Sequence, residues 1–141
     1  MSLRGFSTIN YWADDVAAAS AWYTEVLGVE PYFQRSGPDG TPAYAEFRIG
    51  DNEAELGLVS RAYAPPGLPD QPGGALMYWH VDDLQGTVAR LLELGATEYQ
   101  PVTERGHDFV TAAVVDPFGN VLGVMHNPHY IEQFGATAPT K

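Results

Sequence analysis

With 141 residues, the chain is long enough for a compact domain that buries roughly two-thirds of its unfolded surface. It contains no cysteine, which excludes disulfides, thiolate metal sites and cysteine nucleophiles. Eighteen acidic residues against seven basic ones give a net charge of -11, which argues against binding to nucleic acid or to an anionic membrane surface.

The first half of the sequence predicts a strand, a capped helix and three more strands. Residues 6–12 are typical of a strand, and Asp14-Asp15 offers an N-cap for a helix that ends at Leu27. Gly28 follows, as expected for a left-handed stop. The three later strands are predicted at residues 30–35, 43–49 and 54–60.

The second half repeats this order. A strand is predicted at residues 76–81, Asp82-Asp83 caps a helix that ends near Gly95, and strands follow at 98–102, 109–115 and 121–125. The sequence therefore predicts an α+β fold made of two βαβββ modules. We expect the first module at residues 1–60, a Pro/Gly-rich linker at 61–74, the second module at 75–127 and a tail at 128–141.

Two segments carry a family resemblance. Residues 15–28 combine an aspartate cap, an aromatic-Tyr pair and a Leu-Gly stop, and residues 116–120 (DPFGN) form a turn before the last strand. At these positions of a repeat, they resemble the vicinal oxygen chelate superfamily of glyoxalases, bleomycin resistance proteins and dioxygenases. The resemblance implies curled mixed sheets that enclose a cavity, and a homodimer.

The resemblance also implies where metal ligands would lie. Members with metal chemistry carry one ligand on the first strand and one on the last strand of each module, which here correspond to Thr8, Gly57, Leu76 and Gly123. None of these is a plausible ligand, so we predict no metal and no cofactor. The two glycines are open to two interpretations: close approach of a ligand over a widened cavity floor, or a bend of the barrel.

Strand alternation predicts which side chains share the cavity face with Thr8 and Leu76. The predicted ligand-binding residues are Thr8, Asn10, Trp12, Tyr44, Glu46, Arg48, Gly57, Leu76, Tyr78, His80, Gly123 and Met125. They mix aromatic walls with a few polar groups, which is typical of a small-molecule site. Glu46 with Arg48 could equally be a solvated edge, and His80 a structural hydrogen-bonding group.

The four histidines are further candidates for an acid, a base or a displaced metal ligand. Only His80 falls on the predicted cavity face, whereas His107, His126 and His129 lie in or near loops. His80 and Glu46 are therefore the candidate catalytic residues.

The sequence is compatible with three functions. The first is a metal-independent protein that binds a small organic molecule, such as an antibiotic or toxin. The second is a lyase, isomerase or dioxygenase-type enzyme of the same fold, with displaced metal ligands or acid/base residues. The third is a structural or regulatory dimer with a vestigial pocket. Neither a signal peptide nor a membrane span is recognisable, which favours a cytoplasmic location.

Overall fold

A computed structural model describes residues 2–135 of the chain. The chain divides into two compact units, Met1–Pro66 and Gly67–Lys141. The division lies inside the predicted linker, and each unit holds one of the two predicted modules.

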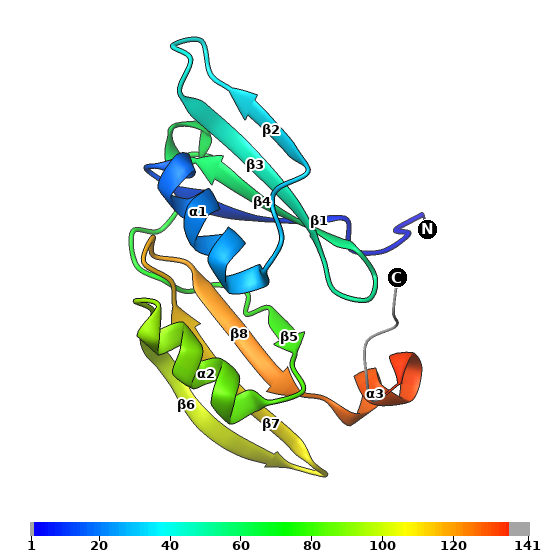
Figure 1. The fold of residues 1–141 in the computed structure, drawn as a ribbon. Helices are drawn as coiled ribbons and strands as arrows, with labels where there is room; N and C mark the ends of the chain where they lie inside the picture. Colours follow the sequence, from blue (N-terminus) through cyan, green and yellow to red (C-terminus); the bar gives the residue numbers. More distant parts are fainter. Residues whose placement is uncertain (1, 136–141) are drawn as a thin grey trace. The chain divides into compact units, whose positions relative to one another are not determined.

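The first unit is a four-stranded mixed sheet with one long helix (Figure 1). Its strands are in the spatial order β1-β4-β3-β2, with β1 parallel to β4 and the other pairs antiparallel. The elements are β1 (Thr8–Ala13), α1 (Val16–Leu27), β2 (Phe33–Ser36), β3 (Pro42–Ile49), β4 (Ala54–Ser60) and the short 3-10 helix η1 (Arg61–Tyr63).

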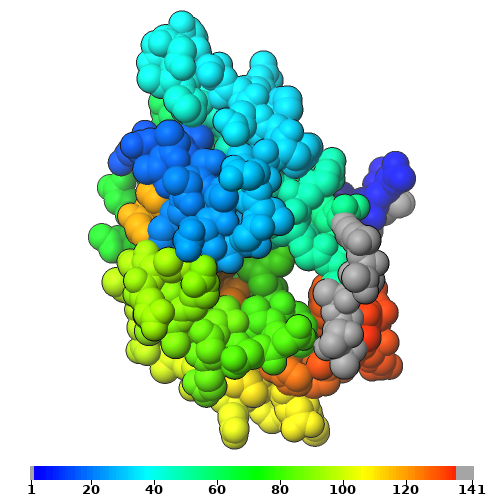
Figure 2. Space-filling view, viewed as in Figure 1, coloured from blue at the N-terminus to red at the C-terminus, as the bar shows by residue number. Residues whose placement is uncertain are grey.

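Helix α1 begins and ends where the sequence predicts. The Asp15 side chain accepts a hydrogen bond from the backbone N–H of Ala18 at 3.0 Å, which satisfies a free donor of the first turn. Gly28 ends the helix with a φ of 71°, a left-handed conformation that glycine adopts without strain. In the space-filling view, α1 (blue) forms part of the surface of the first unit on this side (Figure 2).

The core of the first unit lies between α1 and one face of the sheet. Phe47 is 0% exposed, and the Tyr11 ring lies 5.9 Å from the Tyr23 ring of α1. The other buried hydrophobic residues of this unit are Ala13, Val16, Ala19, Ala45, Ile49, Leu56 and Leu58. The strand residues among them alternate along the chain, so they share one face of the sheet, opposite to the predicted cavity face.

The second unit repeats the arrangement with strand order β5-β8-β7-β6, and again only the first and last strands of the unit are parallel. Neither sheet closes on itself. The elements are β5 (Tyr78–His80), α2 (Leu84–Glu93), β6 (Thr97–Gly106), β7 (Phe109–Val115), β8 (Val121–His126) and α3 (Pro128–Phe134). Asp83 caps α2 by accepting from the Gly86 N–H at 3.0 Å, which parallels Asp15 in the first unit.

The turn before β8 is built around Asp116, which is only 3% exposed. Its Oδ1 accepts hydrogen bonds from the backbone N–H groups of Phe118 and Asn120, both at 2.9 Å. Gly119 has a φ of 94°, which favours glycine at this point of the turn. The sequence of residues 116–120, on which the family resemblance partly rests, is therefore explained by the geometry of this turn.

The structure differs from the prediction at three places in the second unit. Strand β5 begins at Tyr78, so that Leu76 lies outside it, and β6 extends to Gly106 through several register shifts. The predicted tail contains helix α3, whose start is fixed by an Asn127 cap and by Pro128, which needs no N–H partner there. Residues 136–141 of that tail lie outside the described residues. No helix within residues 2–135 is long and apolar enough to cross a membrane.

Candidate functional site

The face of the first sheet that α1 does not cover carries the predicted site residues of this unit; we call it the helix-free face. Strand pairing places Trp12 and Tyr44 on either side of Val59, and Asn10 and Glu46 on either side of Gly57. Residues that are directly paired point to the same side of a sheet. The full set on this face is Thr8, Asn10, Trp12, Phe33, Arg35, Tyr44, Glu46, Arg48, Glu55, Gly57 and Val59.

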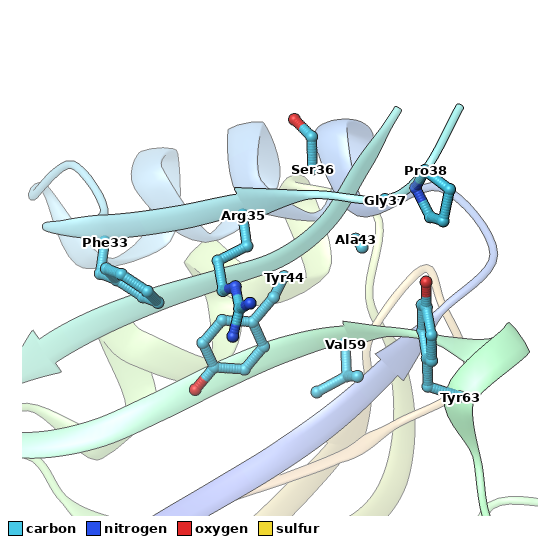
Figure 3. Close-up of a pocket in the computed structure, with 9 residues that line it drawn as sticks. All are labelled: Phe33, Arg35, Ser36, Gly37, Pro38, Ala43, Tyr44, Val59 and Tyr63. Carbon is cyan, nitrogen blue, oxygen red and sulfur yellow. The ribbon is translucent and has the colours of Figure 1, made fainter. Parts of the chain in front are cut away.

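One end of the helix-free face is hollowed into a pocket of about 650 Å³. It is lined by Phe33, Arg35, Ser36, Gly37, Pro38, Ala43, Tyr44, Val59 and Tyr63, all of the first unit. Figure 3 shows Phe33, Arg35, Tyr44 and Val59 projecting from the same side of the sheet, whereas Ser36 projects from the other. A pocket of this size is within the range of small-molecule sites.

Three aromatic rings and one arginine dominate this pocket. Phe33 is 45% exposed and Tyr63 is 58% exposed, although both are large apolar side chains. The Phe33 and Tyr44 rings meet in an edge-to-face arrangement, with 6.2 Å between their centroids. Arg35 lies directly opposite Tyr44 in the strand register, and its guanidinium makes no ion pair or hydrogen bond with any of residues 2–135.

Beside the pocket, Tyr44, Glu46 and Glu55 form a polar group. The Tyr44 hydroxyl donates to Glu46 Oε1 at 2.5 Å. Burial raises the pKa of Glu46, and the charge of Glu55 and a hydrogen bond with its carboxyl raise it further, against the opposing effect of Arg48. Burial and the charge of Glu55 also raise the pKa of Tyr44. A carboxyl that retains its proton more readily than usual can serve as an acid or base.

Arg48 is engaged elsewhere on the same face. Its guanidinium lies 3.8 Å from Glu55 Oε2 and 4.6 Å from the centre of the Tyr32 ring. It also donates a long hydrogen bond of 3.5 Å to the Glu53 carbonyl. Arg48 therefore forms its ion pair with Glu55, which lies directly opposite it in the register, while its charge also acts on Glu46.

The four positions where metal ligands would be expected do not fit a divalent metal. The Thr8 hydroxyl donates to Glu55 Oε1 at 3.1 Å, and Leu76 has no donor atom. A side chain at Gly57 would come within 3.0 Å of the Asn10 and Tyr44 side chains. At Gly123 it would meet the Met77 carbonyl and the Tyr78 ring equally closely.

The space beside both glycines is consequently filled by tyrosine rings rather than left as a widened floor. Tyr44 lies across the first glycine and Tyr78 across the second, where the Tyr78 hydroxyl donates to Gln100 Oε1 at 2.8 Å. Both glycines thus allow close approach, but of groups of the protein itself: two side chains at Gly57, and a backbone carbonyl and the Tyr78 ring at Gly123. A carboxylate cannot occupy either position unless these groups move.

His80 is held within the second unit by helix α3. Its side chain is 7% exposed, and its Nδ1 accepts a hydrogen bond from the Asn127 N–H at 3.1 Å. The ring stacks on Tyr130, with 4.9 Å between centroids and 14° between planes. Because Nδ1 is an acceptor, the proton of the neutral ring is on Nε2, which lies 3.7 Å from Asp82. Through these contacts His80 holds α3 against the second sheet, which is a structural role.

The other histidines are dispersed over the second unit. His126 lies 5.5 Å from the His80 ring, His129 packs edge-to-face against Phe109, and His107 lies in the turn between β6 and β7 with a φ of 51°. Over the part of the chain that the structure describes, no three His, Cys, Asp or Glu side chains are grouped so that they could hold a metal ion.

The predicted site residues are thus divided between the two sheets. Strand pairing places Tyr78 opposite Gly123 and His80 opposite Met125 in the second unit, while Thr8, Asn10, Trp12, Tyr44, Glu46, Arg48 and Gly57 share the helix-free face. Among these predicted residues, Tyr44 is the one that lines the pocket of the first unit. Sequence reasoning missed Phe33, Arg35, Val59 and Tyr63. Phe33 and Arg35 alternate along β2 and lie opposite Glu46 and Tyr44, so strand alternation extended to β2 could have placed both of them on the cavity face.

Comparison with known proteins agrees with this architecture. A family model described as Glyoxalase/Bleomycin resistance protein/Dioxygenase superfamily matches residues 5–124. No curated protein sequence matches significantly.

Many solved structures are similar. The antibiotic binding protein TnmS3 from Streptomyces sp. CB03234 is 23% identical, with a TM-score of 0.65 over 89% of this chain and 98% of that one. A glyoxalase-related enzyme from Fulvimarina pelagi is 20% identical, with a TM-score of 0.68 over 89% and 90%. TioX from Micromonospora sp. ML1 is 16% identical, with a TM-score of 0.61 over 86% and 98%. These similarities are of fold.

Proposed function

Because this chain belongs to the Glyoxalase/Bleomycin resistance protein/Dioxygenase superfamily, we propose that it binds a small organic molecule on the helix-free face of its first unit, without a metal ion. The observation that carries the proposal is the pocket of about 650 Å³, whose lining combines three aromatic rings with an arginine. Aromatic walls supply contact area, and a few polar groups orient the guest.

Two further observations support the proposal, the first for the absence of a metal and the second for the class of ligand. The positions of the expected carboxylate ligands are glycines over which tyrosine rings lie. In addition, a protein of the same fold, TnmS3, is described as an antibiotic binding protein. We therefore place natural antibiotics and toxins first among the ligands to be tested, and we expect a divalent metal to contribute nothing to their affinity.

The test is a binding screen of the full chain against a panel of antibiotics and other small aromatic compounds by isothermal titration calorimetry. We expect at least one ligand whose affinity is unchanged by a chelator. Tyr44→Ala should weaken it by about tenfold or more, because a packed aromatic wall is lost. Tyr99→Ala is the matched control, since Tyr99 is a tyrosine of the second unit that is 44% exposed.

Two results would count against the proposal. The first is a panel in which no compound binds, or in which bound compounds are insensitive to Tyr44→Ala. The second is a divalent ion that co-purifies in stoichiometric amount and whose removal abolishes binding.

An enzyme of the same fold is the second candidate, and the position of Glu46 favours it. The Glu46 carboxyl lies on the same face as the pocket, accepts from Tyr44 at 2.5 Å and has a raised pKa because of burial and Glu55. Such a group could transfer a proton to or from a bound molecule in a lyase or isomerase reaction. His80 is a weaker candidate, because both its ring face and its Nδ1 are occupied by α3.

Turnover of a bound ligand distinguishes the two functions. Mass spectrometry of a ligand incubated with the protein should reveal a product if the chain is an enzyme, and Glu46→Gln should abolish its formation while the ligand still binds. If a product forms at an unaltered rate in both Glu46→Gln and His80→Ala, neither residue is the acid or base.

The homodimer predicted by the family resemblance is a separate proposal. Light scattering coupled to size-exclusion chromatography at micromolar concentration should give about twice the 15.3 kDa mass of the chain. A monomer at that concentration would contradict it.

A further inference from the structure

We propose that the pocket of the first unit takes an aromatic carboxylate, with the carboxylate on the Arg35 guanidinium and the ring system between Phe33, Tyr44 and Tyr63. The inference rests on the proposed function and names the class of ligand. It is carried by three features of the pocket: an arginine whose side chain has no hydrogen-bond or ion-pair partner among residues 2–135, exposed aromatic rings and a volume that suits a small organic guest.

Arg35 is available to an anion, whereas other arginines are already engaged. Arg48 lies 3.8 Å from Glu55, and Arg61 lies 3.2 Å from Asp14. Arg35 has no such contact with residues 2–135, in a chain with eighteen acidic side chains and seven basic ones. The planar guanidinium fork matches a carboxylate with two parallel hydrogen bonds.

The two acidic residues of the β2–β3 hairpin, Asp39 and Glu46, make hydrogen bonds to groups other than Arg35. Asp39 Oδ1 accepts hydrogen bonds from the Thr41 backbone N–H at 3.1 Å and from the Thr41 hydroxyl at 2.7 Å, which fixes it in the turn between β2 and β3. Glu46 is not among the lining residues and accepts from Tyr44 instead. The charge inside the pocket is therefore that of Arg35.

The aromatic side chains determine the rest of the ligand. Phe33 and Tyr63 expose 45% and 58% of their surface, and both border this pocket together with Tyr44. When large apolar side chains are exposed together at one pocket, burying them under a ligand is favourable, and such a patch often marks a binding site. A ring system of two or more fused rings would cover several of them at once, while an arginine in the same lining favours an anionic substituent over a neutral one.

The experiment compares three probes that share the naphthalene ring and differ in charge: 2-naphthoate, its near-isosteric neutral amide 2-naphthamide, and the cation 2-naphthylmethylammonium. Each is titrated into the full chain at low salt and followed by isothermal titration calorimetry. We expect 2-naphthoate to bind about tenfold or more tightly than the amide, because a hydrogen bond between two charged groups is stronger than one to a neutral group, and we expect the ammonium to bind most weakly because Arg35 repels it. The advantage of the carboxylate should shrink as salt is added.

Variants assign the preference to one residue. Arg35→Gln should equalise naphthoate and naphthamide while the amide affinity stays within about twofold, and Arg35→Lys should retain part of the preference. Arg90→Gln is the matched control, because it removes the same charge from α2 of the second unit and leaves the pocket unchanged. Circular dichroism establishes that each variant is folded.

The ligand class is overturned if the amide or the ammonium binds as tightly as the carboxylate, or if Arg35→Gln leaves the preference intact. It is also overturned if none of the three probes binds at millimolar concentration. The proposed function fails only if the wider antibiotic panel also shows no ligand that depends on Tyr44, so the two failures are distinguishable.

Discussion

The Tyr44 hydroxyl donates a hydrogen bond to Glu46 Oε1 at 2.5 Å, across two positions of the same strand. This contact is possible because both side chains point to the helix-free face, where Gly57 leaves room for the Tyr44 ring. It links the aromatic pocket to the pair of carboxyls formed by Glu46 and Glu55. The residues of the proposed site are thus coupled to the packing of the sheet.

The first prediction concerns the pH dependence of stability. The pKa of Glu46 is raised above its ordinary value of 4.5, chiefly by burial, so the folded protein binds this proton more tightly than the unfolded chain does. The free energy of unfolding should therefore fall as the pH rises from 4.5 through the raised pKa. Glu46→Gln should make this fall shallower in urea denaturation at pH values between 4 and 7. Glu98→Gln, at an exposed position of β6, is the control, and identical pH profiles for the wild type and Glu46→Gln would contradict the prediction.

The second prediction ranks three glycine substitutions. A methyl group at Gly123 would meet the Met77 carbonyl of the backbone, whereas one at Gly57 would meet side-chain atoms of Asn10 and Tyr44. Gly123→Ala should cost the most stability, about 2 to 3 kcal/mol, and Gly57→Ala about 1 to 2 kcal/mol, because side chains move aside more readily than backbone. Gly73→Ala has nothing within 4 Å and should be nearly neutral.

Thermal and urea denaturation of the three alanine variants measure this order. If Gly57→Ala and Gly123→Ala are as stable as Gly73→Ala, the space over the two strand glycines is not filled as we describe. Tolerance of Gly57→Glu and Gly123→Glu would further reopen the possibility of a carboxylate metal site.

The third prediction treats His80 as a residue that holds α3. His80→Ala removes the acceptor of the Asn127 N–H and the ring on which Tyr130 stacks. We expect a stability loss of about 1 to 3 kcal/mol, together with faster amide hydrogen exchange in residues 127–134. Asp82→Asn is the control, because it leaves the Nδ1 contact in place. Unchanged exchange in α3 after His80→Ala would argue that the contact is unimportant.

The fourth prediction concerns the helix caps. Asp15→Ala and Asp83→Ala each remove an acceptor for a backbone N–H in the first turn, so each should cost about 1 kcal/mol of stability. Asp14→Ala removes the ion pair between Asp14 and Arg61. Because the Asp14 side chain is 89% exposed, this substitution should cost about 0.5 kcal/mol of stability or less. Equal losses for Asp14→Ala and Asp15→Ala in chemical denaturation would show that the capping role is wrongly assigned.

The sequence by itself predicted the repeat and most of the elements. Apolar spacing and the aspartate and glycine caps predicted α1, and the predicted bounds of β4 and β7 agree with the structure. Alternation also predicted which side chains share a face, because the period of a strand is fixed by backbone geometry. These features depend on neighbours in the chain, so they can be read from local patterns.

Helix α3 and the contacts of the candidate site were decided only by the tertiary structure. The residues of α3 form a weak pattern, and the helix packs through Tyr130 on His80, a residue fifty positions earlier in the chain. Arg35 meets Tyr44 because β2 pairs with β3 in one register, and Arg48 faces Glu55 for the same reason between β3 and β4. Register and side-chain packing join residues far apart in sequence, and that is why alternation predicted the face but not the pocket.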